Sequence, residues 1–148
     1  LFAGAAQQIA MEHRPSVLRP GLRMYAYVTN SADGTVTVVD LVGLSSVATI
    51  AVGPAPSGVR AHPTRDEVWG VSTEGGYAWV IDARSGQVKS RITVGAAPFA
   101  VDFSPDGKRA YVAASGSGTV SAIDCASQKV VASARTGRRP SGNTTALG

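Results

Sequence analysis

The stretch that decides the fold is "YVTNSA", Tyr27 to Ala32, because a segment of the same character returns twice further along the chain. "WGVSTE" begins at Trp69 and "YVAASG" begins at Tyr111, so both intervals are 42 residues. A repeat of constant length that needs no gap indicates one supersecondary unit used several times in succession.

Residues with backbone or packing duties recur at the same offset along the whole repeat. They are the aspartates Asp40, Asp82 and Asp124, the glycines Gly34, Gly76 and Gly118 and also Gly53, Gly95 and Gly137, and the prolines Pro56, Pro98 and Pro140. A period of roughly 40–45 residues with about four strands per unit is typical of a propeller blade rather than of a helical array. We therefore predict an all-β chain of about three four-stranded antiparallel blades.

Each unit divides into four short strands separated by turns. In the second unit these strands are Ser57 to His62, "EVWGVS", "YAWVID" and "VKSRITVG". The third strand carries two adjacent apolar residues, Val80 and Ile81, which predicts burial on both faces by neighbouring blades. The aspartate that ends this strand begins a turn, in which we expect its carboxylate to accept backbone N–H groups two or three residues on.

Composition describes a core-rich chain of about one domain, with 148 residues, 44% of them hydrophobic and 16% charged. The net charge of +4 comes from the ends of the chain. Six of the fourteen basic residues lie there, namely Arg14, Arg19, Arg23, Arg135, Arg138 and Arg139. Residues 24–133 hold eight basic and nine acidic residues, a net charge of −1, without a basic stripe. We therefore expect no nucleic-acid partner.

Sequence signatures of metal, nucleotide and acyl-transfer sites are missing from the chain. Cys125 is the only cysteine, which excludes an intrachain disulfide and a cysteine-based metal cluster. No His-x-His pair, P-loop or Gly-x-Ser-x-Gly elbow occurs, and no apolar run is long enough to cross a bilayer. We expect no metal, no resident cofactor and no transmembrane segment.

The blocks "YVTN", "TVTVVD" and "FSPDGKRAYVA" resemble the YVTN family of β-propeller repeats over about residues 24–140. The resemblance implies the fold but no particular reaction. Proteins of this kind are similar to surface-layer repeat proteins, to seven-bladed lactonase-like proteins, and to propellers that hold haem d1 or accompany quinone-dependent oxidation. The resemblance, together with the low charge density, implies a periplasmic or extracellular location.

The repeat divides the chain into a leader and blade units. We expect a leader at 1–23, units at 24–56, 57–98 and 99–140, and a last strand at 141–148. The first unit lacks its own innermost strand, and three blades are too few to close a ring, because propellers have about four to eight. The chain is then a fragment of a longer propeller, or two chains close a six-bladed ring by exchanging terminal strands. Asn143 stands where Val59 stands in the second unit, which weakens the pairing face for such an exchange.

Candidate binding residues lie on the innermost strands and in the loops at the channel mouth. Arg138 and Arg139 replace small residues of the other repeats and form a pair able to hold a carboxylate or phosphate, or else a basic exposed loop. Arg60 and Asp102 occupy the same repeat position, so neighbouring blades bring them together as an ion pair. His62 is read as a hydrogen-bonded structural residue, or as an axial ligand if the chain holds haem.

Two functions follow from this organisation. The first is a non-enzymatic binding or scaffold module for a protein, a glycan or a second copy of the chain. The alternative is part of a lactonase-like or haem- or quinone-associated oxidoreductase propeller. The feature that separates them is convergence of polar side chains at the channel mouth, which the sequence shows only weakly.

Overall fold

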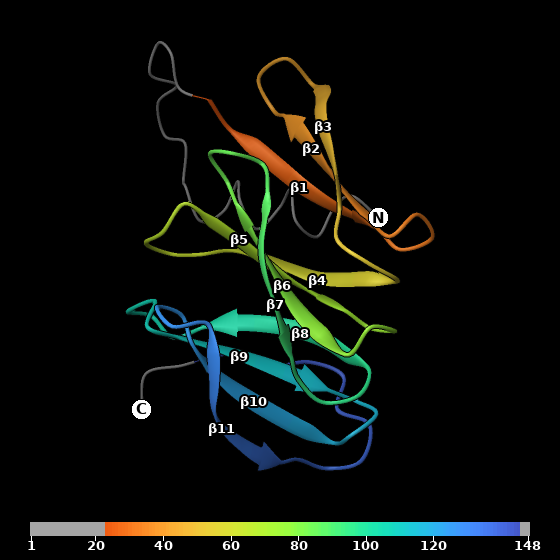
Figure 1. Ribbon diagram of the computed structural model, residues 1–148, viewed down its shortest axis with the longest axis vertical. Coiled ribbons are helices and arrows are strands. Elements are labelled where there is room, and N and C mark those ends of the chain that lie inside the picture. The colour runs from red at the N-terminus through yellow and green to blue at the C-terminus, as the bar shows by residue number, and fades with distance from the viewer. Residues whose placement is uncertain (1–22, 146–148) are drawn as a thin grey trace.

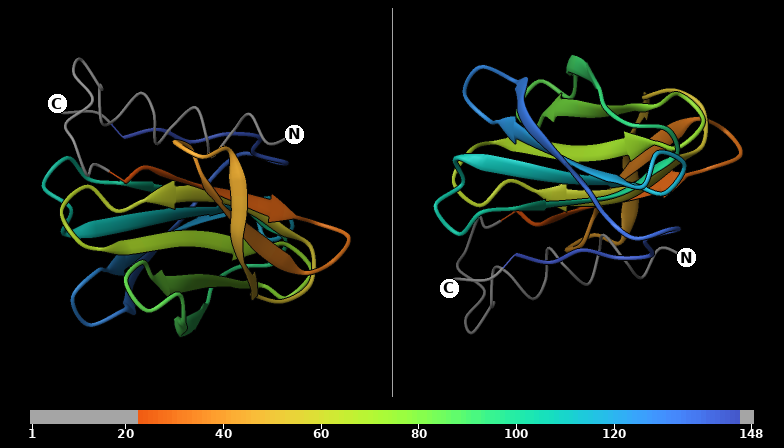
Figure 2. Two further views of the ribbon diagram at one scale, coloured as in Figure 1. Left: turned by 90° about the horizontal axis from the view of Figure 1, so that it is seen from above. Right: turned by 90° about the horizontal axis from the view of Figure 1, so that it is seen from below.

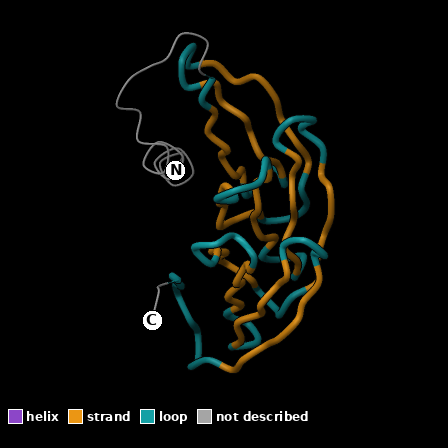
Figure 3. The backbone as a smooth tube through the Cα atoms, turned by 90° about the vertical axis from the view of Figure 1, so that its left-hand side faces the viewer, coloured by secondary structure: helices purple, strands orange, loops and turns teal. Residues whose placement is uncertain are grey.

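The computed structural model describes residues 23–145 as three antiparallel β-sheets that stand side by side in a curved row (Figure 1, Figure 3). The first sheet contains β1 (Tyr25–Asn30), β2 (Thr35–Asp40) and β3 (Ser45–Ala51). The second contains β4 (Pro56–Ala61), β5 (Glu67–Ser72), β6 (Tyr77–Asp82) and β7 (Val88–Thr93). The third contains β8 (Pro98–Phe103), β9 (Arg109–Ala114), β10 (Thr119–Asp124) and β11 (Lys129–Arg135). Within the described residues no helix forms, and the predicted all-β propeller architecture is confirmed.

Strand order within each sheet follows the order along the chain, as propeller blades require. The second and third sheets have four strands, whereas the first has three, and β1 corresponds in the repeat to β5 and β9. Among the described residues, the first blade therefore lacks an innermost strand. Seen from above and from below, the three sheets lie over one another (Figure 2).

Backbone irregularities recur with the repeat as faithfully as the strands do. A β-bulge interrupts the pairing of the third strand with the fourth at Val38/Val39, Val80/Ile81 and Ala122/Ile123. The linkers between blades adopt a left-handed backbone at one position, with φ of 46° at Ala55, 50° at Ala97 and 51° at Arg139. Only the first two of these are small residues, so backbone geometry rather than side-chain size is what the repeat preserves.

Two hydrophobic clusters fill the spaces between neighbouring blades. The first contains Tyr27, Val36, Val38, Ile50, Val52, Val68, Trp79 and Ile81. The second contains Trp69, Val71, Ala78, Val80, Ile92, Val101, Phe103, Ala110, Val112, Ile123 and Cys125. The second blade contributes to both, since Val80 and Ile81 are fully buried on opposite faces. This confirms the prediction of a strand that is covered on both sides.

The recurrent aspartate caps the turn between the third and fourth strands of each blade, as predicted. Asp82 Oδ1 accepts the backbone N–H groups of Arg84 and Ser85, both at 2.9 Å. Asp40 does the same for Val42 and Gly43. The backbone hydrogen bonds hold the pKa of Asp82 below its usual value, because they favour the charged carboxylate.

Residues 141–145 do not form the predicted last strand. They run beside the third blade without strand pairing, although Thr145 Oγ1 donates to the carbonyl oxygen of Phe103 and Thr145 N–H donates to Asp102 Oδ2 at 3.0 Å. The remainder of that predicted strand, 146–148, lies outside the described residues. So does the predicted leader up to residue 22, and Arg23 is exposed.

Candidate functional site

One edge of the curved row gathers the loops that the sequence assigns to the channel mouth. We call it the loop edge; it comprises residues 31–34, 53–57, 73–76, 95–99, 115–118 and 137–141. Each blade anchors the linker that leaves it in the same manner. Gly34 O accepts Val52 N–H at 3.0 Å, and in the other two blades Gly76 O accepts Val94 N–H and Gly118 O accepts Thr136 N–H. The linkers therefore hold equivalent positions, and differences between them reflect their side chains.

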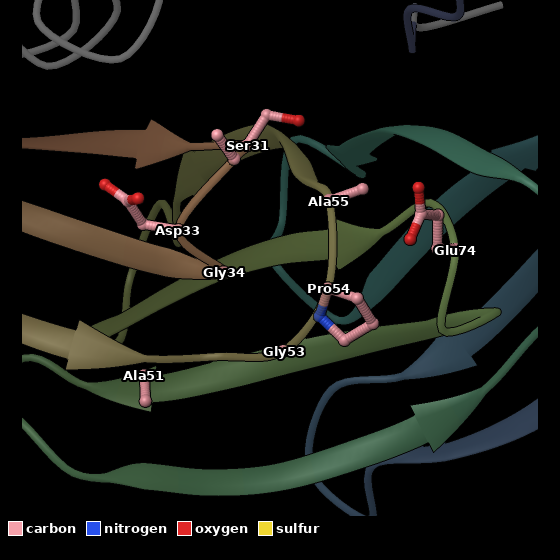
Figure 4. A pocket seen from close by; sticks show the side chains of 9 residues that line it. Ser31, Asp33, Gly34, Ala51, Gly53, Pro54, Ala55 and Glu74 are labelled. Carbon is pink, nitrogen blue, oxygen red and sulfur yellow. The ribbon is translucent and has the colours of Figure 1, made fainter.

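A pocket of about 730 Å³ opens at the loop edge between the first and second blades (Figure 4). Its walls are Ser31, Ala32, Asp33, Gly34, Ala51, Gly53, Pro54, Ala55 and Glu74. Asp33 and Glu74 are the charged residues of this lining and flank the pocket from different blades (Figure 4). Both are exposed, so the pocket presents two carboxylates to solvent. We call it the acidic pocket.

A second pocket, of about 440 Å³, occupies the repeat-equivalent place on the third blade. It is lined by Ser115, Gly116, Ser117, Gly118, Arg135, Thr136, Gly137, Arg138 and Arg139. Arg135, Arg138 and Arg139 stand where Ala51, Pro54 and Ala55 stand in the acidic pocket. The same hollow is thus lined with carboxylates at one end of the row and with guanidinium groups at the other. We call it the basic pocket.

The structure places Arg138 and Arg139 together in this pocket, with both side chains exposed. A pair of guanidinium groups in a shallow hollow is suited to a carboxylate, since each offers a planar fork of N–H donors. The wall that Glu74 of the next blade supplies to the acidic pocket has no counterpart here among the described residues.

The predicted ion pair between innermost strands is present. Arg60 Nε on β4 lies 3.8 Å from Asp102 Oδ1 on β8, with 28% and 15% of the two side chains exposed. Asp102 Oδ1 also accepts Phe103 N–H at 2.9 Å. Because Asp102 holds groups from three segments, it ties the second blade, its own strand and the segment at 141–145 together.

His62 lines neither the acidic pocket nor the basic pocket, and both of its ring nitrogens form hydrogen bonds. Nδ1 accepts the backbone N–H groups of Thr64 and Arg65, at 3.1 and 3.0 Å. Nε2 therefore carries the hydrogen and donates it to Gly107 O at 2.9 Å. The ring is buried and packs edge-on against the Phe103 ring, with 4.8 Å between the two ring centroids. The axial-ligand interpretation does not fit this geometry, because no ring nitrogen is left to bind a metal.

Sequence reasoning named the loops of the acidic pocket but missed its two carboxylates. Glu74 aligns in the repeat with Ala32 rather than with Asp33, so the offset of 42 never pairs them. A search for acidic residues on adjacent predicted loops would have found them. Within the part of the chain that the structure describes, no group of three or more His, Cys, Asp or Glu side chains is placed to hold a metal.

Comparisons with known proteins establish the fold. No protein-family model matches the chain, and no curated protein matches it. Hydrazine synthase from Kuenenia stuttgartiensis aligns with a TM-score of 0.74 and 28% identity, over 77% of this chain and 33% of that one. The dihydro-heme d1 dehydrogenase NirN, solved in complex with DHE, aligns with a TM-score of 0.72 and 20% identity, over 81% and 27%.

AztD from Citrobacter koseri aligns with a TM-score of 0.68 and 15% identity, over 86% of this chain and 37% of that one. These similarities agree with the propeller architecture. The chain spans about a third of the length of the solved proteins it matches. Membership of the YVTN family stays a prediction from the sequence.

Proposed function

We propose that the chain is a non-enzymatic β-propeller module that binds a protein partner through its loop edge. The observation that carries the proposal is the opposite charge of two repeat-equivalent pockets, with Asp33 and Glu74 in one and three arginines in the other. Such a surface favours a partner whose charges are arranged in the complementary order.

The partner we favour is a protein rather than a glycan. Neither pocket lining contains an aromatic side chain on which a sugar ring could stack. Both linings instead combine charged groups with backbone and small side chains, which suits lysine, arginine and carboxylate groups of a polypeptide. A glycan partner is an outcome of the test described next.

Labelled hexalysine and hexaglutamate peptides test this proposal by fluorescence anisotropy. We expect hexalysine to bind the acidic pocket and hexaglutamate to bind the basic pocket, both more weakly as salt increases. The double variant Asp33→Asn with Glu74→Gln should weaken hexalysine binding about tenfold and leave hexaglutamate binding unchanged. The double variant Arg138→Ser with Arg139→Ala should do the reverse.

Asp66 and Arg84 supply the matched control. They form an exposed ion pair at 2.5 Å, at the opposite end of the second blade. Asp66→Asn with Arg84→Gln removes the same number of charges, and we expect it to change neither affinity. Failure of both peptides to bind would overturn the proposal. Binding of a neutral oligosaccharide with the same affinity in all of these variants would favour a glycan partner.

The alternative, a propeller that holds haem or a quinone, has a direct test in the visible absorption spectrum of the purified protein. A haem or quinone band would favour it over the binding module.

We also propose a periplasmic or extracellular location, which rests on the YVTN resemblance and on the 16% of charged residues. Among the described residues, no helix is both long and apolar enough to span a membrane.

A further inference from the structure

The first blade has a place for a fourth strand along the free edge of β1. Within residues 23–145, β1 pairs with β2 alone. Its repeat equivalents pair on both sides, β5 with β4 and β6, and β9 with β8 and β10. A free edge presents a row of backbone N–H and C=O groups with which a further strand can pair. The strand that belongs at this edge is the equivalent of β4 and β8.

The predicted leader carries the sequence of such an innermost strand. β4 begins with Pro-Ser at Pro56 and contains Val59, and the same repeat position in β8 is Val101. "RPSVLR", at 14–19, contains the same Pro-Ser pair, and its valine, Val17, stands 42 residues before Val59. These residues lie outside the described part of the chain. A repeat position that innermost strands fill twice with valine predicts the same role for Val17.

The leader segment is one residue shorter than β4, and the missing residue falls on a β-bulge. Pro15 lies 41 residues before Pro56, whereas Val17 lies 42 residues before Val59. The residue without an equivalent is Gly58, where the pairing of β4 with β5 shifts register and the backbone is left-handed, with φ of 45°. A bulge is one extra residue in one strand of a pair. Without that residue, the segment fits β1 as a regular antiparallel ladder.

The connection to β1 has the length that the other two blades use. Five residues join β4 to β5, at 62–66, and five join β8 to β9, at 104–108. Residues 20–24 are also five, and they begin with Pro-Gly, a dipeptide that favours a turn. Met24 O accepts Leu41 N–H at 2.9 Å, and the equivalent residues just before β5 and β9 accept the same bond. The chain therefore enters β1 in the same way as it enters β5 and β9.

We propose that residues 15–19 form the innermost strand of the first blade, antiparallel to β1. The pairing of β4 with β5 gives the register through the repeat offset, with Val17 opposite Val28 and Leu18 opposite Tyr27. Residues that lie opposite each other in an antiparallel pair project to the same face. Tyr27 belongs to the hydrophobic cluster between the first two blades, so Leu18 joins that cluster. Val17 takes the other face, beside the partly exposed Val28.

This strand also anchors one wall of the acidic pocket. In the second blade, Ala55 O, just before the innermost strand, accepts Thr73 N–H at 3.0 Å, and the third blade repeats this bond. The repeat equivalents in the first blade are Arg14 and Ser31, and Ser31 lines the acidic pocket. Arg14 then lies at the loop edge, with its carbonyl bonded to Ser31 N–H. The inference stands apart from the proposed function, because it concerns pairing within one chain.

Disulfide trapping in the full chain tests the register. In a Cys125→Ala background, Val17→Cys combined with Val28→Cys should lose its free thiols on mild oxidation and keep the mass of one chain. Arg19→Cys combined with Val28→Cys is shifted by two residues and should form about tenfold less disulfide. Diagonal neighbours lie about 7–8 Å apart, which is further than a disulfide spans. Far-UV circular dichroism checks that both variants keep their β-structure.

Hydrogen exchange at the Tyr27 amide tests the pairing without new cysteines. Leu41 N–H bonds to Met24 O, so the alternation of the ladder between β1 and β2 turns Tyr27 N–H toward the free edge. We expect this amide to be protected in the full chain. Leu18→Pro should accelerate its exchange about tenfold or more, because the proline cannot donate to β1. Val17→Pro is the matched control, since Val17 N–H faces away from β1 in this register, and its effect should be smaller.

The outcomes separate this inference from its alternatives. Rapid exchange at Tyr27 in the unaltered chain, equal exchange in the two proline variants, or equal yields from the two cysteine pairs would overturn it. A covalent dimer in place of the intrachain disulfide would also overturn it, because a second copy would then supply the strand. Exchange in β9 reports whether the third blade stays folded in each variant. A chain that binds hexalysine but fails these tests would leave the proposed function standing.

Discussion

His62 in the second blade donates its Nε2 hydrogen to the carbonyl oxygen of Gly107 in the third blade, across 2.9 Å. The same ring accepts two backbone N–H groups of its own turn through Nδ1. One neutral imidazole therefore closes a turn and fastens two blades together. Protonation would place a hydrogen on Nδ1, which could then no longer accept the backbone N–H groups of Thr64 and Arg65.

The free energy of unfolding should depend on pH through His62. Burial lowers the pKa of His62 from its ordinary value of 6.5; the hydrogen bond to Gly107 and the charge of Glu67 raise it, and Arg65 lowers it, each to a smaller extent. The unfolded chain then binds more protons, so the stabilisation is complete above pH 6.5 and is lost as the pH falls through the lowered pKa. Urea titrations at several pH values should show the free energy of unfolding falling as the pH falls through this range, and the fall should be smaller in the variant His62→Gln. A fall of the same size in the variant would contradict the prediction.

Gly70→Ala should destabilise the contact between the first two blades. A Cβ atom at Gly70 would lie 2.1 Å from Cζ2 of Trp79, whose side chain is fully buried and cannot move aside. We expect a loss of about 1–3 kcal/mol or more in the free energy of unfolding, typical of overpacking. Gly137→Ala is the control, because its Cβ would meet nothing within 4 Å. Equal midpoints in urea for the two variants would refute the argument.

Cys125 should be unreactive in the folded protein. Burial raises the pKa of its thiol to about 11, so little thiolate exists near neutral pH. Alkylation by iodoacetamide at about pH 8 should be slow in buffer and rapid in concentrated urea. Val101→Ala, which removes a buried side chain from the same cluster, should speed the reaction by loosening the contact between blades. Rapid labelling of the unaltered native protein would show that the thiol is accessible.

Asp102→Ala should release the segment at 141–145. Asp102 Oδ2 accepts Thr145 N–H at 3.0 Å, and bonds to charged acceptors contribute about 1.5–3 kcal/mol. Hydrogen exchange at the Thr145 amide should accelerate about tenfold or more in the variant. Asp106→Ala is the control, because Asp106 accepts only from Ser104 and Lys108 of its own turn among the hydrogen bonds described. Equal protection of the Thr145 amide in both variants would show that Asp102 does not hold the segment at 141–145.

Repetition made most of the fold predictable. The blade count, the strand order and the aspartate turns at Asp40, Asp82 and Asp124 all follow from an offset of 42 and from local backbone chemistry. The Arg60–Asp102 pair was predictable for the same reason, since equivalent strands of neighbouring blades lie side by side. The predicted last strand does not form at residues 141–145, because the described residues supply no second strand with which it could pair.

The candidate site was predictable only as a set of loops. Arg138 and Arg139 stand out in the sequence because they break the repeat, whereas Asp33 and Glu74 lie one residue out of register with each other. His62 was open to two interpretations until its partners were known. One of those partners, Gly107, lies 45 residues further along the chain.

Local chemistry and regular spacing were sufficient to determine a row of antiparallel blades, because a repeated pattern of turns and apolar strands must bury the same faces each time. Tertiary structure alone decided which acidic side chains share a pocket. Asp33 and Glu74 are 41 residues apart in the sequence, and only the stacking of the first two blades places both in the lining of one pocket, whereas Arg135, Arg138 and Arg139 are already close along the chain. Side chains from different blades share a pocket through space, and no spacing along the chain encodes that proximity.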